Sequence, residues 1–133
     1  MNAAFYLIDQ LIAQGVTRFC IAPGTRCAPL ISVAARHPLA QTIVHFDERG
    51  LGFYALGFGK GAKIPAALIV TSGSALGNLL PAVMEAHHSC TPLILLTADR
   101  PADLRSCGAN QTTMQPSLFS PFVRFEEDLP PDL

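Results

Sequence analysis

Four short apolar runs recur along the chain, and a segment with helical character separates each run from the next. The runs are nearly continuous in apolar character rather than alternating, which is typical of strands buried on both faces of a parallel sheet. Alternation of such strands with helices indicates an α/β fold with a parallel sheet and helices on both of its faces. The expected strands span residues 16–24, 41–46, 65–73 and 91–101.

Glycine and proline set the limits of the expected helices. Gly15 ends the first helix in the manner of a C-terminal glycine, and Pro29 is tolerable only in the first turn of the second. Pro81 predicts a kink or a break in the fourth. After the last strand the periodicity fades, and residues 122–125 are expected to add a short strand. The expected helices span residues 2–14, 26–38, 47–62 and 74–88.

Length and charge narrow the class of protein. The 133 residues suffice for one domain with a real core, which we place at residues 1–126, and the acidic, proline-rich residues 127–133 are expected to begin an interdomain linker.

Only 14% of the residues are charged, below the roughly 25% of an average soluble domain, so a partner is expected to cover some surface. The net charge of −1 gives no basis for binding nucleic acid, and no apolar run reaches the ~20 residues of a membrane helix.

Polar groups follow the carboxyl end of every expected strand. They are "APGTR" at 22–26, "DER" at 47–49, "TSGS" at 71–74 and "TADRP" at 97–101, with "GANQ" at 108–111 in the next loop. Ligands of open α/β sheets bind beyond the carboxyl ends of the strands. If the strands are parallel, these groups converge on one edge of the sheet, and the convergence predicts a ligand site there.

Each group also has a simpler interpretation. Arg26 can be a solvated turn residue instead of a bidentate ligand for a carboxylate or phosphate. The helix after "TSG" can hold an anion at its free N–H groups, or Ser72 or Ser74 can cap it. Asp99 can cap a turn or pair with Arg100. The phosphate-loop and dinucleotide glycine patterns are absent, so the sequence does not indicate nucleotide binding.

Glu48 is the candidate acid–base residue. Asp47 and Glu48 stand where acids favour the start of a helix through its macrodipole. The glycines and the apolar strand around Glu48 leave it little polar company, and such a setting favours proton exchange near neutrality. Both interpretations stay open at the level of the residues themselves.

Five segments carry a family resemblance. "IAPGTRCAPL", "HFDERGLGFYALGFGKG", "ALIVTSGSALGNLLPAVMEA", "LILLTADRP" and "CGANQTTMQP" closely resemble the N-terminal domain of the MenD family, the 2-succinyl-5-enolpyruvyl-6-hydroxy-3-cyclohexene-1-carboxylate (SEPHCHC) synthases of menaquinone biosynthesis. The resemblance runs in order from about residue 3 to about residue 125. It implies a pyrimidine-binding (PYR) domain, thiamine diphosphate as cofactor, and isochorismate and 2-oxoglutarate as substrates.

The resemblance also implies roles for single residues. Glu48 is implied to be catalytic, hydrogen-bonding the aminopyrimidine ring of the cofactor and sharing a proton with it. Thr25 stands where the family commonly has serine, which keeps the hydroxyl group, whereas Gln115 lies in a stretch that departs from the family and receives no role. The cofactor side is implied to include Gly24, Thr71 and Gly73, and the isochorismate side Thr25, Arg26, Arg100, Asn110 and Gln111.

Family members are several times longer than this chain. Their "GDG…N" motif, which holds Mg²⁺ or Mn²⁺, does not occur here, so the metal ligands are expected outside this chain. The chain alone is expected to be inactive, and the complete enzyme to be a cytoplasmic homodimer or homotetramer. The four cysteines lack a C-x-x-C pair and are expected to be reduced thiols. Two alternatives stay open: the PYR domain of another thiamine-diphosphate decarboxylase or carboligase, and a non-catalytic assembly or binding module.

Overall fold

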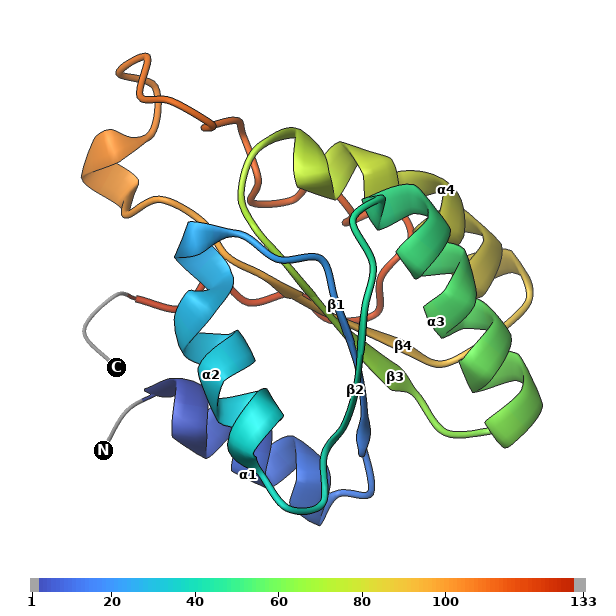
Figure 1. Ribbon diagram of the computed structural model, residues 1–133. Helices are drawn as coiled ribbons and strands as arrows, with labels where there is room; N and C mark the ends of the chain where they lie inside the picture. The colour runs from blue at the N-terminus through green and yellow to red at the C-terminus, as the bar shows by residue number, and fades with distance from the viewer. Residues whose placement is uncertain (1–2, 131–133) are drawn as a thin grey trace.

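The computed structural model describes residues 3–130, and within them four strands form one parallel sheet (Figure 1). The order across the sheet is β2-β1-β3-β4, so β1 and β3 lie in the middle and β2 and β4 at the edges. Every strand pair is parallel, which confirms the predicted sheet. The strands are β1 (Arg18–Ile21), β2 (Gln41–Val44), β3 (Ala66–Val70) and β4 (Leu93–Thr97).

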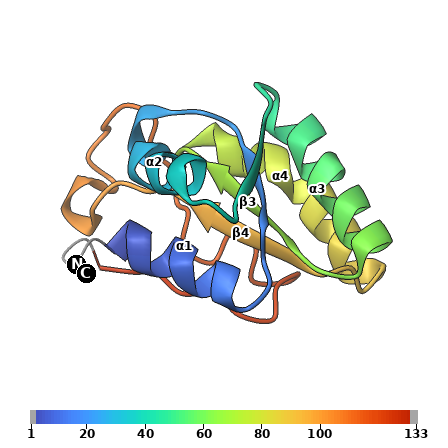
Figure 2. The same ribbon diagram turned by 60° about the horizontal axis from the view of Figure 1, so that its bottom comes forward.

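Helices cover both faces of the sheet, as the sequence predicts. One face packs against α1 and α2 and the other against α3 and α4 (Figure 2). The first predicted helix begins at residue 2, which lies outside the described residues. The helices are α1 (Ala3–Ala13), α2 (Ala28–Arg36), α3 (Glu48–Ala62) and α4 (Ser74–His88), with short 3₁₀ helices η1 (Thr25–Cys27) and η2 (Ala102–Leu104).

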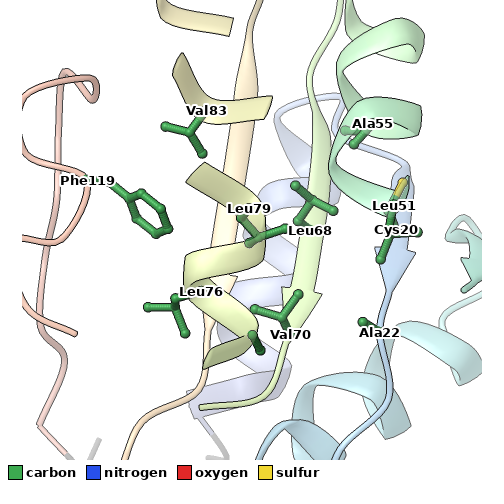
Figure 3. Packing of buried hydrophobic residues seen from close by; sticks show 12 residues of the cluster. Cys20, Ala22, Leu51, Ala55, Leu68, Val70, Leu76, Leu79, Val83 and Phe119 are labelled. Carbon is green, nitrogen blue, oxygen red and sulfur yellow. The ribbon is translucent and has the colours of Figure 1, made fainter. Parts of the chain in front are cut away.

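The central strand supplies both hydrophobic cores. Because side chains alternate along a strand, Ile69 belongs to the core beneath α1 and α2 while Leu68 and Val70 belong to the core beneath α3 and α4. Figure 3 shows the second core, where Leu79 of α4 lies between Leu68 of β3 and Phe119 of the C-terminal segment. All five residues of β3 are buried, which matches its unbroken apolar sequence.

The edge strand β2 is less buried than its apolar sequence predicts. Three of its four residues are exposed, and the strand ends at Val44 rather than at residue 46. Phe46 beyond it is 87% exposed. Position in the sheet explains the difference, since an edge strand lacks a neighbour on one side.

One further prediction is wrong, and the predicted kink or break at Pro81 is wrong as to the break. Residues 122–125 form turns and coil instead of a strand, because the Phe122 carbonyl accepts a hydrogen bond from His87 Nδ1 (3.0 Å) rather than from a neighbouring strand. Pro81 does not break α4, which continues from Ser74 to His88. None of the helices within residues 3–130 has the length and apolar character needed to cross a membrane.

The C-terminal segment returns to the domain without regular structure. The domain boundary at residue 126 stays a prediction. Asp128, in the expected linker, accepts two hydrogen bonds from the guanidinium of Arg105 at 2.7 and 3.0 Å. Residues 131–133 of that linker lie outside the described residues.

Candidate functional site

The carboxyl edge of the sheet gathers the loops that the sequence singles out. All four strands run in the same direction, so the segments after β1, β2, β3 and β4 leave from the same edge. Two close contacts tie neighbouring loops together at this edge, one between Gly24 and Thr71 and one between Arg26 and Gln111. The predicted convergence is therefore confirmed at these points.

Glu48 is the first residue of α3, next to a conventional N-cap. Asp47 accepts hydrogen bonds from the backbone N–H groups of Arg49 (3.3 Å) and Gly50 (3.1 Å), which explains why the helix begins here. The predicted start of the helix at this acidic pair is confirmed.

The surroundings of Glu48 are more polar than the sequence predicts. Its side chain is half-buried, and its Oε2 accepts a hydrogen bond from Nδ2 of Asn78 in α4 at 3.0 Å. The expectation of little polar company is therefore wrong, because the partner comes from 30 residues along the chain. Asn78 was missed; its place one helical turn beyond Ser74, near the same edge, is the signal that could have found it.

The backbone of Gly24, in the loop after β1, packs against the side chain of Thr71, in the loop after β3. A Cβ atom built on Gly24 would lie 2.4 Å from the Cβ of Thr71, so a side chain at position 24 has no room. Thr71 is 8% exposed, and its hydroxyl has no hydrogen-bond partner within residues 3–130. Buried hydroxyl groups are usually paired, so this group requires a partner that residues 3–130 do not supply.

Two arginines from different loops donate to one backbone oxygen. Arg26 Nη2 donates to the carbonyl oxygen of Asn110 at 3.2 Å, and Arg100 Nη2 donates to the same oxygen at 2.9 Å. Arg26 Nη1 also donates to Gln111 Oε1 at 3.0 Å. Guanidinium groups match carboxylates in geometry and charge, so the pair can hold an anion. Thr25, beside Arg26, is exposed on the same turn.

The loop that carries Gln111 is fastened to the start of α4. Ser72 Oγ donates to the Gln111 carbonyl oxygen at 2.8 Å, and Gln111 Nε2 donates back to the Ser72 carbonyl oxygen at 3.2 Å. The expected capping of α4 by Ser72 or Ser74 is wrong, because Gly73 occupies the N-cap without a side-chain cap. The N–H of Gly73 is occupied by Gln115 Oε1 at 2.8 Å.

Asp99 does not make the expected side-chain pair with Arg100. Its Oδ1 accepts from the backbone N–H of Arg100 at 2.7 Å, and its Oδ2 lies 3.0 Å from Nε of Arg105. Hydrogen bonding to Asp128 raises the pKa of Arg105, and the same contact lowers the pKa of Asp128. Arg105 also donates to the Arg100 carbonyl oxygen at 3.1 Å, so it buttresses the loop that carries Arg100.

Comparisons with known proteins identify the family of the chain. Residues 1–120 match the family described as thiamine pyrophosphate enzyme, N-terminal TPP binding domain. The chain is 50% identical over 125 residues to a 2-succinyl-5-enolpyruvyl-6-hydroxy-3-cyclohexene-1-carboxylate synthase of Rubrobacter xylanophilus, which covers 94% of this chain and 22% of that protein. The same figures for a synthase of that name from Salinibacter ruber are 50% identity over 125 residues, with 94% and 21% covered.

A plant protein is similar over the same stretch. "Protein PHYLLO, chloroplastic" of Arabidopsis thaliana is 50% identical over 125 residues, covering 94% of this chain and 7% of that protein. The chain therefore spans about a fifth of the length of the bacterial relatives and less of the plant relative.

Proposed function

The chain belongs to the family of thiamine pyrophosphate enzyme N-terminal domains, and from this premise we propose that it is the PYR domain of a SEPHCHC synthase. The complete enzyme would release CO₂ from 2-oxoglutarate and join the remaining four-carbon unit to isochorismate, giving SEPHCHC. One observation carries the proposal: Arg26 and Arg100 meet at the Asn110 carbonyl on the same sheet edge as Glu48. The identity of 50% to synthases of this name supports the choice of reaction.

The residues at the edge fit the aminopyrimidine ring of thiamine diphosphate. The ring offers nitrogen donors and acceptors, and Thr71 offers a buried hydroxyl without a partner among the described residues. Gly24 and Gly73 let the loops around this hydroxyl approach closely, since a Cβ at either position would meet Thr71 or Gln111. When bound, the cofactor supplies the electron sink for decarboxylation.

Glu48 is the group that holds a proton for the ring in this proposal. The hydrogen bond from Asn78 fixes Oε2, which leaves Oε1 as the oxygen to meet a ring nitrogen. Glu48 is half-buried, so fewer water molecules compete with the ring nitrogen for its carboxylate group. A fully hydrated carboxylate would bond to water instead. General acid–base assistance of this kind is typically worth about 10²- to 10⁴-fold in rate.

Isochorismate is a dicarboxylate, and the arginine pair suits it. Arg26 and Arg100 stay charged across the physiological range and can each hold one carboxylate oxygen pair. Asn110 and Gln111 add amide groups, which hydrogen-bond without adding charge. Thr25 adds a hydroxyl on the same turn.

Parts of the enzyme outside this chain complete the proposal. Mg²⁺ or Mn²⁺ and the diphosphate group would be held by a further domain, and the cytoplasmic enzyme would work as a homodimer or homotetramer. Large apolar side chains support a covered surface near α3, because Phe46, Phe53, Tyr54 and Met84 are all exposed in the isolated chain. By itself the chain is proposed to be inactive.

Substitution of Glu48 in the complete enzyme tests the proposal. Glu48→Gln keeps the shape and removes the acid, so turnover of 2-oxoglutarate with isochorismate should fall about 10²- to 10⁴-fold. Glu85→Gln, an exposed glutamate on α4, is the matched control and should leave turnover unchanged. Steady-state kinetics measure both. Unchanged turnover in Glu48→Gln, or efficient turnover of 2-oxoglutarate only with other acceptors, contradicts the proposal.

A further inference from the structure

Gln115 is a buried side chain that bonds two backbone groups far apart in the sequence. It is 6% exposed. Its Oε1 accepts from the N–H of Gly73 at 2.8 Å, and its Nε2 donates to the carbonyl oxygen of Ala98 at 3.0 Å. Both lengths lie within the normal range for N–H···O hydrogen bonds, so each end of the amide has a partner.

The two bonded groups belong to opposite halves of the proposed site. Gly73 follows Thr71 and caps α4 with φ +81°, close against the backbone of Gln111. Ala98 continues β4, where its N–H donates to the Val70 carbonyl oxygen at 3.0 Å, and it stands two residues before Arg100. Gln115 therefore links the loop on the cofactor side to the loop on the isochorismate side.

We propose that Gln115 is a positioning residue that sets the distance between the Thr71–Gly73 loop and Arg100. The inference rests on the proposed function, which gives the two loops their ligands. A neutral amide presents one acceptor and one donor at the same time. Removing it leaves the buried N–H of Gly73 and the part-buried carbonyl of Ala98 without this partner. The two loops then keep only their other links, from Ala98 to Val70 and from Ser72 to Gln111, and their spacing is less fixed.

Loosening this link acts on binding more than on the chemical step. In the proposed function Arg100 binds the diacid. A more mobile Arg100 must be ordered when the substrate binds, and this entropy cost lowers the affinity for isochorismate. Glu48 follows β2, the strand farthest from β4 in the sheet order, and keeps its bond to Asn78. The expected signature is thus a raised KM for isochorismate with kcat little changed.

The test uses Gln115→Met in the complete enzyme. Methionine keeps the length and volume of glutamine and removes both hydrogen bonds, so KM for isochorismate should rise about tenfold and kcat should stay within about threefold. The dissociation constant for thiamine diphosphate, measured by calorimetric titration, should also rise. Amide hydrogen exchange at Gly73 should accelerate, a readout that needs no substrate.

Val83→Ala is the control for general destabilisation. Val83 is a buried residue of α4 in the core, away from the edge loops. It should lower the thermal midpoint while KM, kcat and the exchange of Gly73 stay as in the parent enzyme. If Gln115→Met lowers the thermal midpoint and leaves KM and Gly73 exchange unchanged, as Val83→Ala should, the positioning role is overturned.

A second variant keeps the proposal testable if Gln115→Met does not fold. Gln115→Asn retains the amide but shortens it by one methylene, so it reaches one backbone partner and should raise KM for isochorismate by a smaller factor. A KM equal to that of the parent enzyme overturns the proposal. Failure of the proposed function would give a different result, because the parent enzyme itself would not use isochorismate. Hydrogen exchange at Gly73 can still be measured in that case.

Discussion

Gly24→Ala is a sharp test of the contact between the loops after β1 and β3. Gly24 has φ −164° and ψ 158°, an extended conformation open to any residue, so backbone strain contributes nothing. The new Cβ would lie 2.4, 2.7 and 2.8 Å from Cβ, Oγ1 and Cγ2 of Thr71. Carbon atoms normally rest about 3.5–4.0 Å apart, so the loops must separate by about 1 Å.

Overpacking of this kind costs about 1–3 kcal/mol. The N–H of Ala22 donates to the Ile69 carbonyl oxygen at 3.0 Å beside this contact, so its hydrogen exchange reports the local loss. The stated cost corresponds to exchange about 5- to 150-fold faster. Exchange can be followed in the complete enzyme by NMR or mass spectrometry.

A double-substitution cycle identifies the cause. Thr71→Gly removes the Cβ atom that Gly24→Ala would meet, so the two changes together should cost less than their sum. Thr71→Ala removes Oγ1 and Cγ2 but keeps the Cβ at 2.4 Å, so it should relieve the clash less than Thr71→Gly does. Unchanged exchange at Ala22 in Gly24→Ala, or equal relief by both Thr71 variants, would refute the steric reasoning.

Two other outcomes follow from single side chains. Burial raises the pKa of the Cys20 thiol to about 11. Iodoacetamide at about pH 8 should therefore label the exposed Cys90 in the native protein and spare Cys20, which mass spectrometry can measure. Labelling of both cysteines at equal rates would contradict this. The hydrogen bond from Arg105 lowers the pKa of Asp128, so this pair contributes above the ordinary carboxyl pKa and is lost as the pH falls through the lowered value. Arg105→Ala removes the guanidinium that lowers this pKa and should therefore raise the Asp128 titration midpoint followed by NMR.

The sheet could be predicted because its apolar runs report burial directly. The central strand β3 is buried along its whole length, and its sequence has no polar interruption. β2 also contains apolar residues but lies at an edge of the sheet. Strand order is set by packing between distant segments, which local sequence patterns do not encode. The strand predicted at 122–125 is wrong for the same reason, because packing between distant segments decides the structure there. This segment packs against α4 as a loop.

The site was predictable where it depends on strand direction. Arg26, Arg100 and Gln111 follow strands that end at one edge, and the structure brings them together. Asn78 and Gln115 escaped because their partners lie 30 and 42 residues away. An amide in a helix or a loop has no local feature that reveals a distant hydrogen bond. The roles of the predicted residues toward cofactor and substrate remain proposals.

The Asn110 carbonyl oxygen gives the arginine pair a resident competitor. In the free protein both guanidinium groups already point at an oxygen of the chain itself. An incoming monoacid replaces this neutral acceptor at one guanidinium with a charged one, whereas a diacid offers a second carboxylate to the other guanidinium. Under the proposed function, selectivity for two acid groups over one thus follows from the two guanidinium groups themselves.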